Sequence, residues 1–239
     1  MTVLAPRARL LLGAVVAALA IMAVGAAGAE AKLVKVTGST TVTPSAGAKS
    51  FLANAGVSVD PVAPATAANG TFTFPIFAGF GDTKTYNGLL AHKGGLKFTK
   101  GNKSAVVRRF VAVRLAKTSV LLAQIPGVKG GCQHVAKATR AFAKKHPRAR
   151  YTTRKAALKY PKAAKHVVQG LKRYCKQGRV IILATLTNGS KSVSGGTATL
   201  TADLNLSNQA AKIVNRVAGS HVVNAGALLG SATSTVTKG

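Results

Sequence analysis

Two cysteines and three histidines are the residues of this sequence with the richest chemistry, and all five lie in one short stretch. They are Cys132, His134, His146, His166 and Cys175. Thiolate and imidazole groups are the ligands that Zn²⁺ prefers, but a structural zinc site pairs its ligands at short, recurring intervals. None of those intervals occurs here, and neighbouring lysines would repel a dication. The stretch therefore does not predict a metal site.

The first 31 residues indicate the compartment in which those thiols work. Arg7 and Arg9 precede an apolar run from Leu10 to Gly28, and Ala-x-Ala sequences follow up to residue 31. A charged start, an apolar middle and a small-residue exit are typical of a secretory signal peptide, here 1–31. The alternative is an uncleaved anchor, because about 19 apolar residues can just span a bilayer. Either way we expect a secreted protein associated with the cell envelope, where two cysteines favour one disulfide.

The stretch 129–179 is predicted to form a basic helical hairpin inserted into a β-rich chain. It holds 16 lysines and arginines and no acid, and its apolar residues recur at helical spacing. Antiparallel helices would bring Cys132, at the start of the first, close to Cys175, at the end of the last. A disulfide there would stabilise the small, self-repelling hairpin by roughly 4 kcal/mol.

A cationic hairpin of this kind attracts anionic cell-envelope polymers or a membrane surface, although a run of charges can also be merely a solvated surface. Nucleic acid is disfavoured as a partner, because no RNP-like motif accompanies the charges and the chain is secreted. The residues expected to bind polyanions are Lys144, Lys145, Arg148, Arg150, Arg154, Lys155, Lys172 and Arg173.

Acidic residues are too few for several enzyme classes. The chain has 239 residues, 34 of them Lys or Arg and only 4 Asp or Glu, with a net charge of +30. Glycosidases need two carboxylates at a set separation, and Mg²⁺ or Ca²⁺ sites need several. The sequence contains neither a nucleophile elbow nor a phosphate-binding glycine loop. We therefore expect a non-enzymatic protein with no catalytic residue, and keep a hydrolase without a recognisable motif as a third possibility.

The rest of the mature chain predicts strands. Alternating or β-branched runs at 71–77 and 196–203 follow the turn pairs Asn69-Gly70 and Asn188-Gly189. Strands are also expected at 119–125 and 180–187, where they would pair as one hairpin across the insertion. Together these runs predict a mainly β, antiparallel, sandwich-like domain over 32–239, interrupted by 129–179.

Two short helices are expected within this β-rich domain. The first would be capped by Thr43, with Pro44 in its first turn, and would end at Gly56. The second would be capped by Ser207 and would end at Gly219.

Three segments of the β-rich part resemble the HtaA-type domain of actinobacterial surface proteins. They are 48–52, 70–75 and 92–98, and 179–186 and 194–200 resemble the later part of that domain. The resemblance covers about 32–125 and 179–239 and leaves out the basic insertion. It implies a secreted, mostly β, sandwich-like module that binds haem at the cell surface and passes it inward.

The resemblance also implies a haem-ligand set, from which this sequence departs. The family's tyrosine ligand would fall near Asn54 and its helping histidine near Gly101, so neither ligand type is present. Tyr86 and His92 are the remaining candidates for binding a cofactor, in a different geometry. Both His92, in a turn before a strand, and His221 are expected on the surface or at a cap.

The sequence thus predicts a non-enzymatic, secreted or cell-surface binding module that resembles haem-uptake domains but lacks their usual ligands. The alternative is a protein that binds cell-envelope polyanions through the basic insertion.

Overall fold

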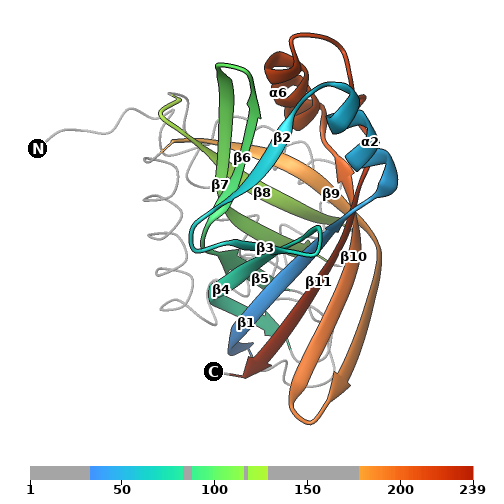
Figure 1. Ribbon diagram of the computed structural model, residues 1–239. Helices are drawn as coiled ribbons and strands as arrows, with labels where there is room; N and C mark the ends of the chain where they lie inside the picture. The colour runs from blue at the N-terminus through green and yellow to red at the C-terminus, as the bar shows by residue number, and fades with distance from the viewer. Residues whose placement is uncertain (1–32, 83–87, 116–117, 129–177, 239) are drawn as a thin grey trace, which may run out of the picture.

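The computed structural model describes residues 33–82, 88–115, 118–128 and 178–238, in which strands dominate (Figure 1). The two helices of these residues are α2 (Ala46–Asn54) and α6 (Asn208–Ala218). The strands are β1 (Leu33–Pro44), β2 (Ser58–Val62), β3 (Thr66–Ala68), β4 (Thr71–Asp82), β5 (Gly88–His92), β6 (Gly95–Lys100), β7 (Lys103–Leu115), β8 (Thr118–Pro126), β9 (Gly178–Ser194), β10 (Thr197–Leu206) and β11 (Leu228–Lys238).

Eight of these strands form a closed antiparallel barrel. Hydrogen bonds join β5, β4, β1, β11, β10, β9 and β8 in that order. The strand β7 pairs with β8 on one side and with β5 on the other, which closes the ring. The short strands β2 and β6 extend the sheet beyond β7, and β3 pairs with β4. Both helices lie at one end of the barrel (Figure 1).

The prediction of a sandwich-like fold is therefore wrong, whereas the mainly antiparallel β character and the two short helices are confirmed. A sandwich and a barrel share the same alternation of inward and outward side chains along each strand. What separates them here are the pairings of β7, in which Val111 lies opposite Ala91 on β5 and opposite Leu122 on β8. The pattern within one strand does not reveal which strands will be its neighbours.

A bulge in β7 lets one edge of this strand pair with two other strands, β6 and β5. Residues 103–108 pair with β6, and residues 111–114 pair with β5. Between them Arg109 adopts a φ of 54°, and its N–H donates to the Gly94 carbonyl over 2.9 Å. Gly94 itself has a φ of 83°, and a Cβ there would lie 2.5 Å from the Ala65 nitrogen, so only glycine fits. This junction fixes the end of β5, where His92 lies.

Of the two turns predicted at Asn-Gly pairs, one is confirmed and the other is wrong. Asn69-Gly70 forms the predicted two-residue turn between β3 and β4, with both φ angles positive. The turn predicted at Asn188-Gly189 is wrong, because β9 continues through it and both residues oppose Ala202 of β10 as a bulge. The turn that joins β9 to β10 is made by Gly195-Gly196.

The pairing predicted across the insertion is confirmed. The strand β8 lies antiparallel to β9, with Pro126 opposite Gly178 and Ser119 opposite Leu186. No helix in the described ranges is long and apolar enough to cross a membrane.

Serines cap both helices. Ser207 Oγ accepts from the Ala210 N–H over 3.1 Å, and Gly219 ends α6 with a φ of 72°, as predicted. The cap of α2 is Ser45, whose Oγ accepts from the Ala48 N–H over 3.0 Å, rather than the predicted Thr43. The helix starts later because Pro44 still belongs to β1, where it pairs with Gly230 of β11.

Candidate functional site

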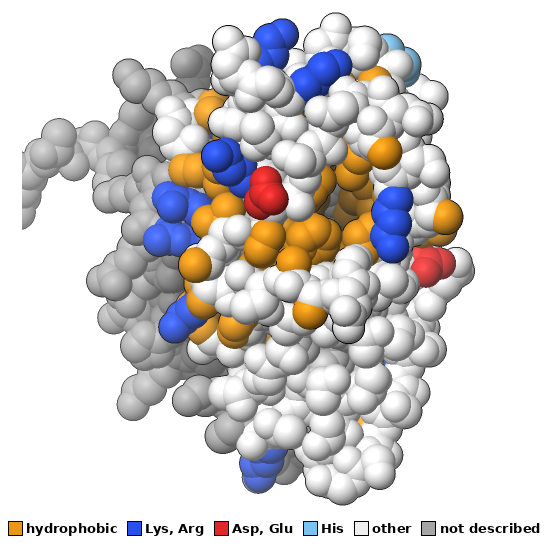
Figure 2. Space-filling model, in the orientation of Figure 1, with side chains coloured by type: hydrophobic (Ala, Val, Ile, Leu, Met, Phe, Trp, Pro, Cys, Tyr) orange, Lys and Arg blue, Asp and Glu red, His pale blue; other side chains and the backbone are white. Residues whose placement is uncertain are grey.

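The barrel encloses a cavity of about 1080 Å³ whose wall is mostly apolar. Because side chains alternate along a strand, every second residue from Ala198 to Leu206 and from Ala232 to Val236 lines it. Figure 2 shows hydrophobic side chains gathered around a hollow on the face that carries α2 and β2. The volume is at the upper end of the range of small-molecule sites. The cavity can therefore hold an organic molecule of considerable size.

The two ends of the cavity have different walls. Toward the helices the wall is aromatic, and the rings of Phe74 and Phe110 meet edge to face, 5.0 Å apart. These two rings belong to the same hydrophobic cluster as Ala210, Ala211 and Val214 of α6. The exposed Lys49 of α2 also belongs to the wall at this end. Toward the opposite end the wall includes the polar residues Arg114 and Lys238, so that the apolar section is flanked by cations on both sides.

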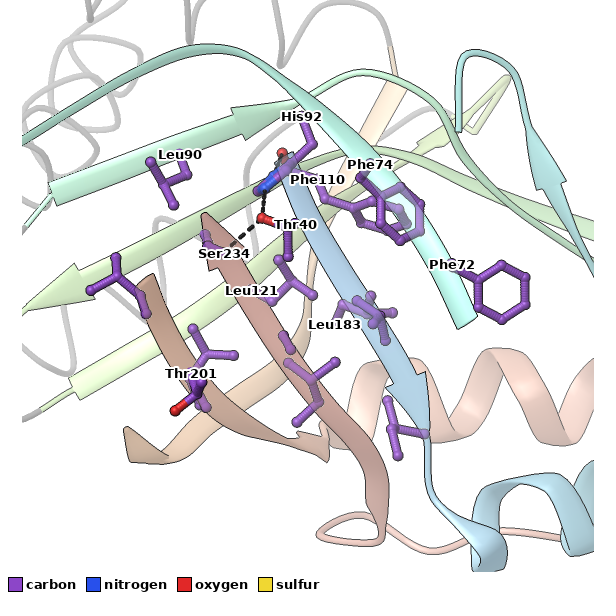
Figure 3. A pocket seen from close by; sticks show the side chains of 18 of the residues that line it. Thr40, Phe72, Phe74, Leu90, His92, Phe110, Leu121, Leu183, Thr201 and Ser234 are labelled. Atoms are coloured by element: carbon purple, nitrogen blue, oxygen red, sulfur yellow. Dashed lines mark hydrogen bonds between the residues drawn. The ribbon is translucent and has the colours of Figure 1, made fainter. Parts of the chain in front are cut away.

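A chain of three buried polar side chains interrupts the apolar wall (Figure 3). Thr40 Oγ1 lies 2.7 Å from His92 Nε2 and 2.7 Å from Ser234 Oγ. His92 Nδ1 lies 3.1 Å from the Phe110 carbonyl oxygen. Thr40 and Ser234 are direct neighbours on β1 and β11, and His92 reaches them from β5, across the inner face of β4. The three side chains are only 7 %, 2 % and 8 % exposed, for Thr40, His92 and Ser234 in turn.

Burial sets the charge of this histidine. It lowers the pKa of His92 from 6.5 to about 4, although the hydrogen bond to the Phe110 carbonyl acts in the opposite direction. The ring is therefore neutral at pH 7. A carbonyl oxygen can only accept, so Nδ1 carries the proton and Nε2 accepts from the Thr40 hydroxyl.

A hydroxyl next to a histidine is also the arrangement of nucleophilic catalysis. A general base works best when its pKa is near the working pH, and a pKa of about 4 makes His92 a weak base. The group that orients the ring is the neutral carbonyl of Phe110, where a serine-hydrolase triad has a carboxylate. This cluster is built to hold a neutral chain of hydrogen bonds rather than to transfer a proton.

The structure corrects one of the two histidine predictions. A surface position for His92 is wrong, because β5 extends through it and the turn begins only at Lys93. His221 is exposed in the loop after α6, as predicted, where its ring nitrogens contact Asn215 and Asn224. Tyr86, the predicted Cys132–Cys175 disulfide and the eight predicted polyanion-binding residues lie outside the described residues.

Sequence reasoning missed Thr40 and Ser234. Each interrupts an inward series of small or apolar residues, as in Ala232, Ser234 and Val236. A lone hydroxyl in such a series is the signal that could have found them.

The part of the chain that the structure describes offers no axial ligand for haem at the cavity apart from His92. It contains no tyrosine, cysteine or methionine, and no group of three or more potential metal-ligating side chains, and its other histidine, His221, does not line the cavity. Both ring nitrogens of His92 already make hydrogen bonds. The positions at which the resemblance places the usual ligands are Asn54, exposed at the end of α2, and Gly101, in the turn between β6 and β7.

Solved structures from Corynebacterium glutamicum align with this chain. The C-terminal domain of HtaA aligns with 86% of this chain and 99% of its own length, with a TM-score of 0.53 and 15% identity. The two folds are similar. The N-terminal domain of HtaA aligns with 84% of this chain and 97% of its own length, with a TM-score of 0.48 and 12% identity. For the heme-binding protein HtaB these shares are 87% and 96%, with a TM-score of 0.46 and 10% identity.

No protein-family model matches the sequence, and neither does any curated protein. The resemblance to the HtaA-type domain that the sequence indicated is confirmed at the level of the fold.

Proposed function

We propose that this protein is a binding protein that holds an apolar small molecule inside its barrel. The observation that carries the proposal is the cavity of about 1080 Å³, whose wall is formed by inward-facing aromatic and aliphatic side chains. A non-enzymatic role agrees with the weakly basic, fully hydrogen-bonded His92 in its middle.

The free energy gained by burying an apolar ligand in such a cavity is large enough for binding. Each buried CH₂ group contributes about 0.8 kcal/mol, so a chain of about ten carbons gains roughly 8 kcal/mol before the cost of lost freedom is subtracted. The remaining free energy corresponds to dissociation constants in the micromolar range or weaker. Cations at both ends of the wall, among them Lys49 and Arg114, would also favour ligands with an anionic group.

A fluorescence titration of the full chain with Nile red tests this proposal. The dye should become bright on entering the cavity. Ala232→Trp places an indole inside the barrel and should weaken binding at least tenfold. Thr235→Trp is the control, because Thr235 lies on the same strand, is exposed and does not line the cavity. A titration without a rise in Nile red fluorescence, or equal affinity of all three proteins for the dye, would contradict binding inside the barrel.

Haem is the second candidate ligand, favoured by the similarity of the fold to the C-terminal domain of HtaA. The described side chains argue against ordinary ligation, so haem binding would depend on Tyr86 or on another residue outside the described ranges. Titration of the full chain with haem, read at the Soret band, decides between the two candidates. A shift at stoichiometric haem that Tyr86→Ala abolishes and His92→Ala preserves supports haem. An unchanged spectrum removes this candidate.

Secretion through the segment 1–31 and binding of envelope polyanions through the basic insertion remain predictions. Loss of salt-sensitive cell-wall binding on deletion of 129–179 would support the second.

A further inference from the structure

We propose that the hydrogen-bonded chain of Thr40, His92 and Ser234 selects the ligand by accepting a hydrogen bond from it. The barrel therefore prefers an apolar molecule carrying a hydroxyl group. This inference rests on the proposed function, because it concerns a ligand inside the same cavity. It assigns a specificity role to three residues that contact one another in the wall.

The Phe110 carbonyl fixes the direction of the whole chain of hydrogen bonds. It can only accept, so the proton of the neutral imidazole is on Nδ1. Nε2 then has a lone pair and no proton, and it accepts from the Thr40 hydroxyl over 2.7 Å. The single proton of Thr40 is thereby used, so the contact of 2.7 Å with Ser234 needs the serine hydroxyl as its donor.

Counting donors and acceptors shows what is left for a ligand. The only proton of Ser234 Oγ is donated to Thr40. This oxygen can still accept a hydrogen bond, and Ser234 lines the cavity. The polar spot in the wall is therefore an acceptor without a donor. A ligand hydroxyl can satisfy it, whereas an ether or ketone oxygen would face it with a second set of lone pairs.

The surroundings make this difference effective. The side chains near the three residues are apolar, among them Leu90, Phe74 and Leu121 (Figure 3). The other hydroxyl labelled there, that of Thr201, contacts Ser190 on the neighbouring strand. In such a wall, other polar groups do not compete for the hydrogen bond between the ligand hydroxyl and Ser234. A ligand oxygen without a proton would place two acceptors opposite each other in a buried site, which is unfavourable. We expect discrimination of about tenfold.

The test compares decanol with its methyl ether as competitors of Nile red on the full chain. The wild type should bind decanol about tenfold more tightly than the ether. Ser234→Val removes the acceptor and covers Thr40, so it should bind both compounds alike. Ser231→Val, on the same strand but exposed and outside the cavity wall, should keep the preference.

The outcomes separate this inference from the proposed function. If the wild type binds both compounds equally, or Ser234→Val keeps the preference, the selection by Ser234 is wrong while the cavity remains a binding site. If neither compound displaces the dye, the inference is also wrong, and if the dye itself does not bind, the proposed function fails with it.

Nitrogen NMR of the wild-type histidines gives a second measurement that needs no variant to fold. A proton on Nδ1 and a bare Nε2 in His92 at pH 7 support the inference. A proton on Nε2 would reverse the chain of hydrogen bonds and overturn it.

Discussion

The centre of the barrel and the loop between α6 and β11 each hold one histidine, and each ring has hydrogen-bonding contacts at both nitrogens. His221 finds its partners, Asn215 and Asn224, within a few residues of itself in the chain. His92 meets Thr40 from 52 positions away, and Thr40 meets Ser234 from 194 positions away. The same side chain is a local, solvated link in one place and a buried, neutral member of a long-range cluster in the other.

The comparison shows that burial, rather than the number of hydrogen bonds, decides what a histidine does here. A buried polar group that loses its partner must bear the full cost of its desolvation, whereas water replaces a lost partner at the surface. His92 has a pKa lowered to about 4 and lines the cavity, whereas His221 is exposed in its loop. The two regions should therefore respond very differently to substitution.

The largest expected effect comes from removing the buried ring. His92→Ala leaves the Thr40 hydroxyl and the Phe110 carbonyl without their partner, and should lower the free energy of unfolding by about 3 kcal/mol. His221→Ala should lower it by less than about 0.5 kcal/mol, because water can replace the exposed ring. Urea unfolding at pH 7 measures both. Equal losses would remove the distinction between the two regions.

Acid should act on the same site with a somewhat smaller effect. The unfolded chain protonates His92 near pH 6.5 and the folded chain only near pH 4, so between these values the unfolded state binds more protons. The stability that the neutral ring contributes is thus complete above pH 6.5 and is lost as the pH falls toward 4. The loss amounts to about 2 kcal/mol between pH 7 and pH 5.

The control for this pH dependence is His92→Gln, which keeps a polar side chain but does not titrate. Urea unfolding at the two pH values should show the additional loss in the wild type and not in the variant. Parallel stability curves for the two proteins would show that the ring is not held neutral by burial.

A smaller effect is expected from Asn215, the residue of α6 that organises the loop. Asn215 Oδ1 accepts from the backbone N–H groups of Val222 and Val223, and its Nδ2 donates to the Val223 carbonyl. Asn215→Ala should cost about 1 kcal/mol, because these bonds are only partly buried. The melting temperature of this variant, compared with that of His92→Ala, measures the difference. A loss as large as that of His92→Ala would show that local links matter as much as the cluster.

Several local features of this fold and one long-range pairing, that of β8 with β9, could be predicted from the sequence. The cap at Ser207, the end at Gly219 and the Asn69-Gly70 turn depend on neighbours in the chain, and they were predicted correctly. The closure of the barrel through β7 depends on partners far apart in the sequence, and it was missed.

The sequence names His92 as a candidate cofactor-binding residue but does not place it inside the barrel, for the same reason. His92 ends a short strand, Gly88–His92, whose residues carry no strong strand pattern, so a surface turn was predicted there. Its burial follows from the bulge at Arg109 and from the closing pairing of β7, neither of which has a local signal. The contact between Thr40 and Ser234 can be recognised only once β1 and β11 are known to be neighbours.

A crystal structure of the full chain grown with an iodinated fatty alcohol tests the central claim most directly. The account predicts an anomalous iodine peak inside the barrel, with the alcohol oxygen within hydrogen-bonding distance of Ser234 Oγ. An iodine peak on the outer surface, with an interior that stays free of the alcohol, would contradict it.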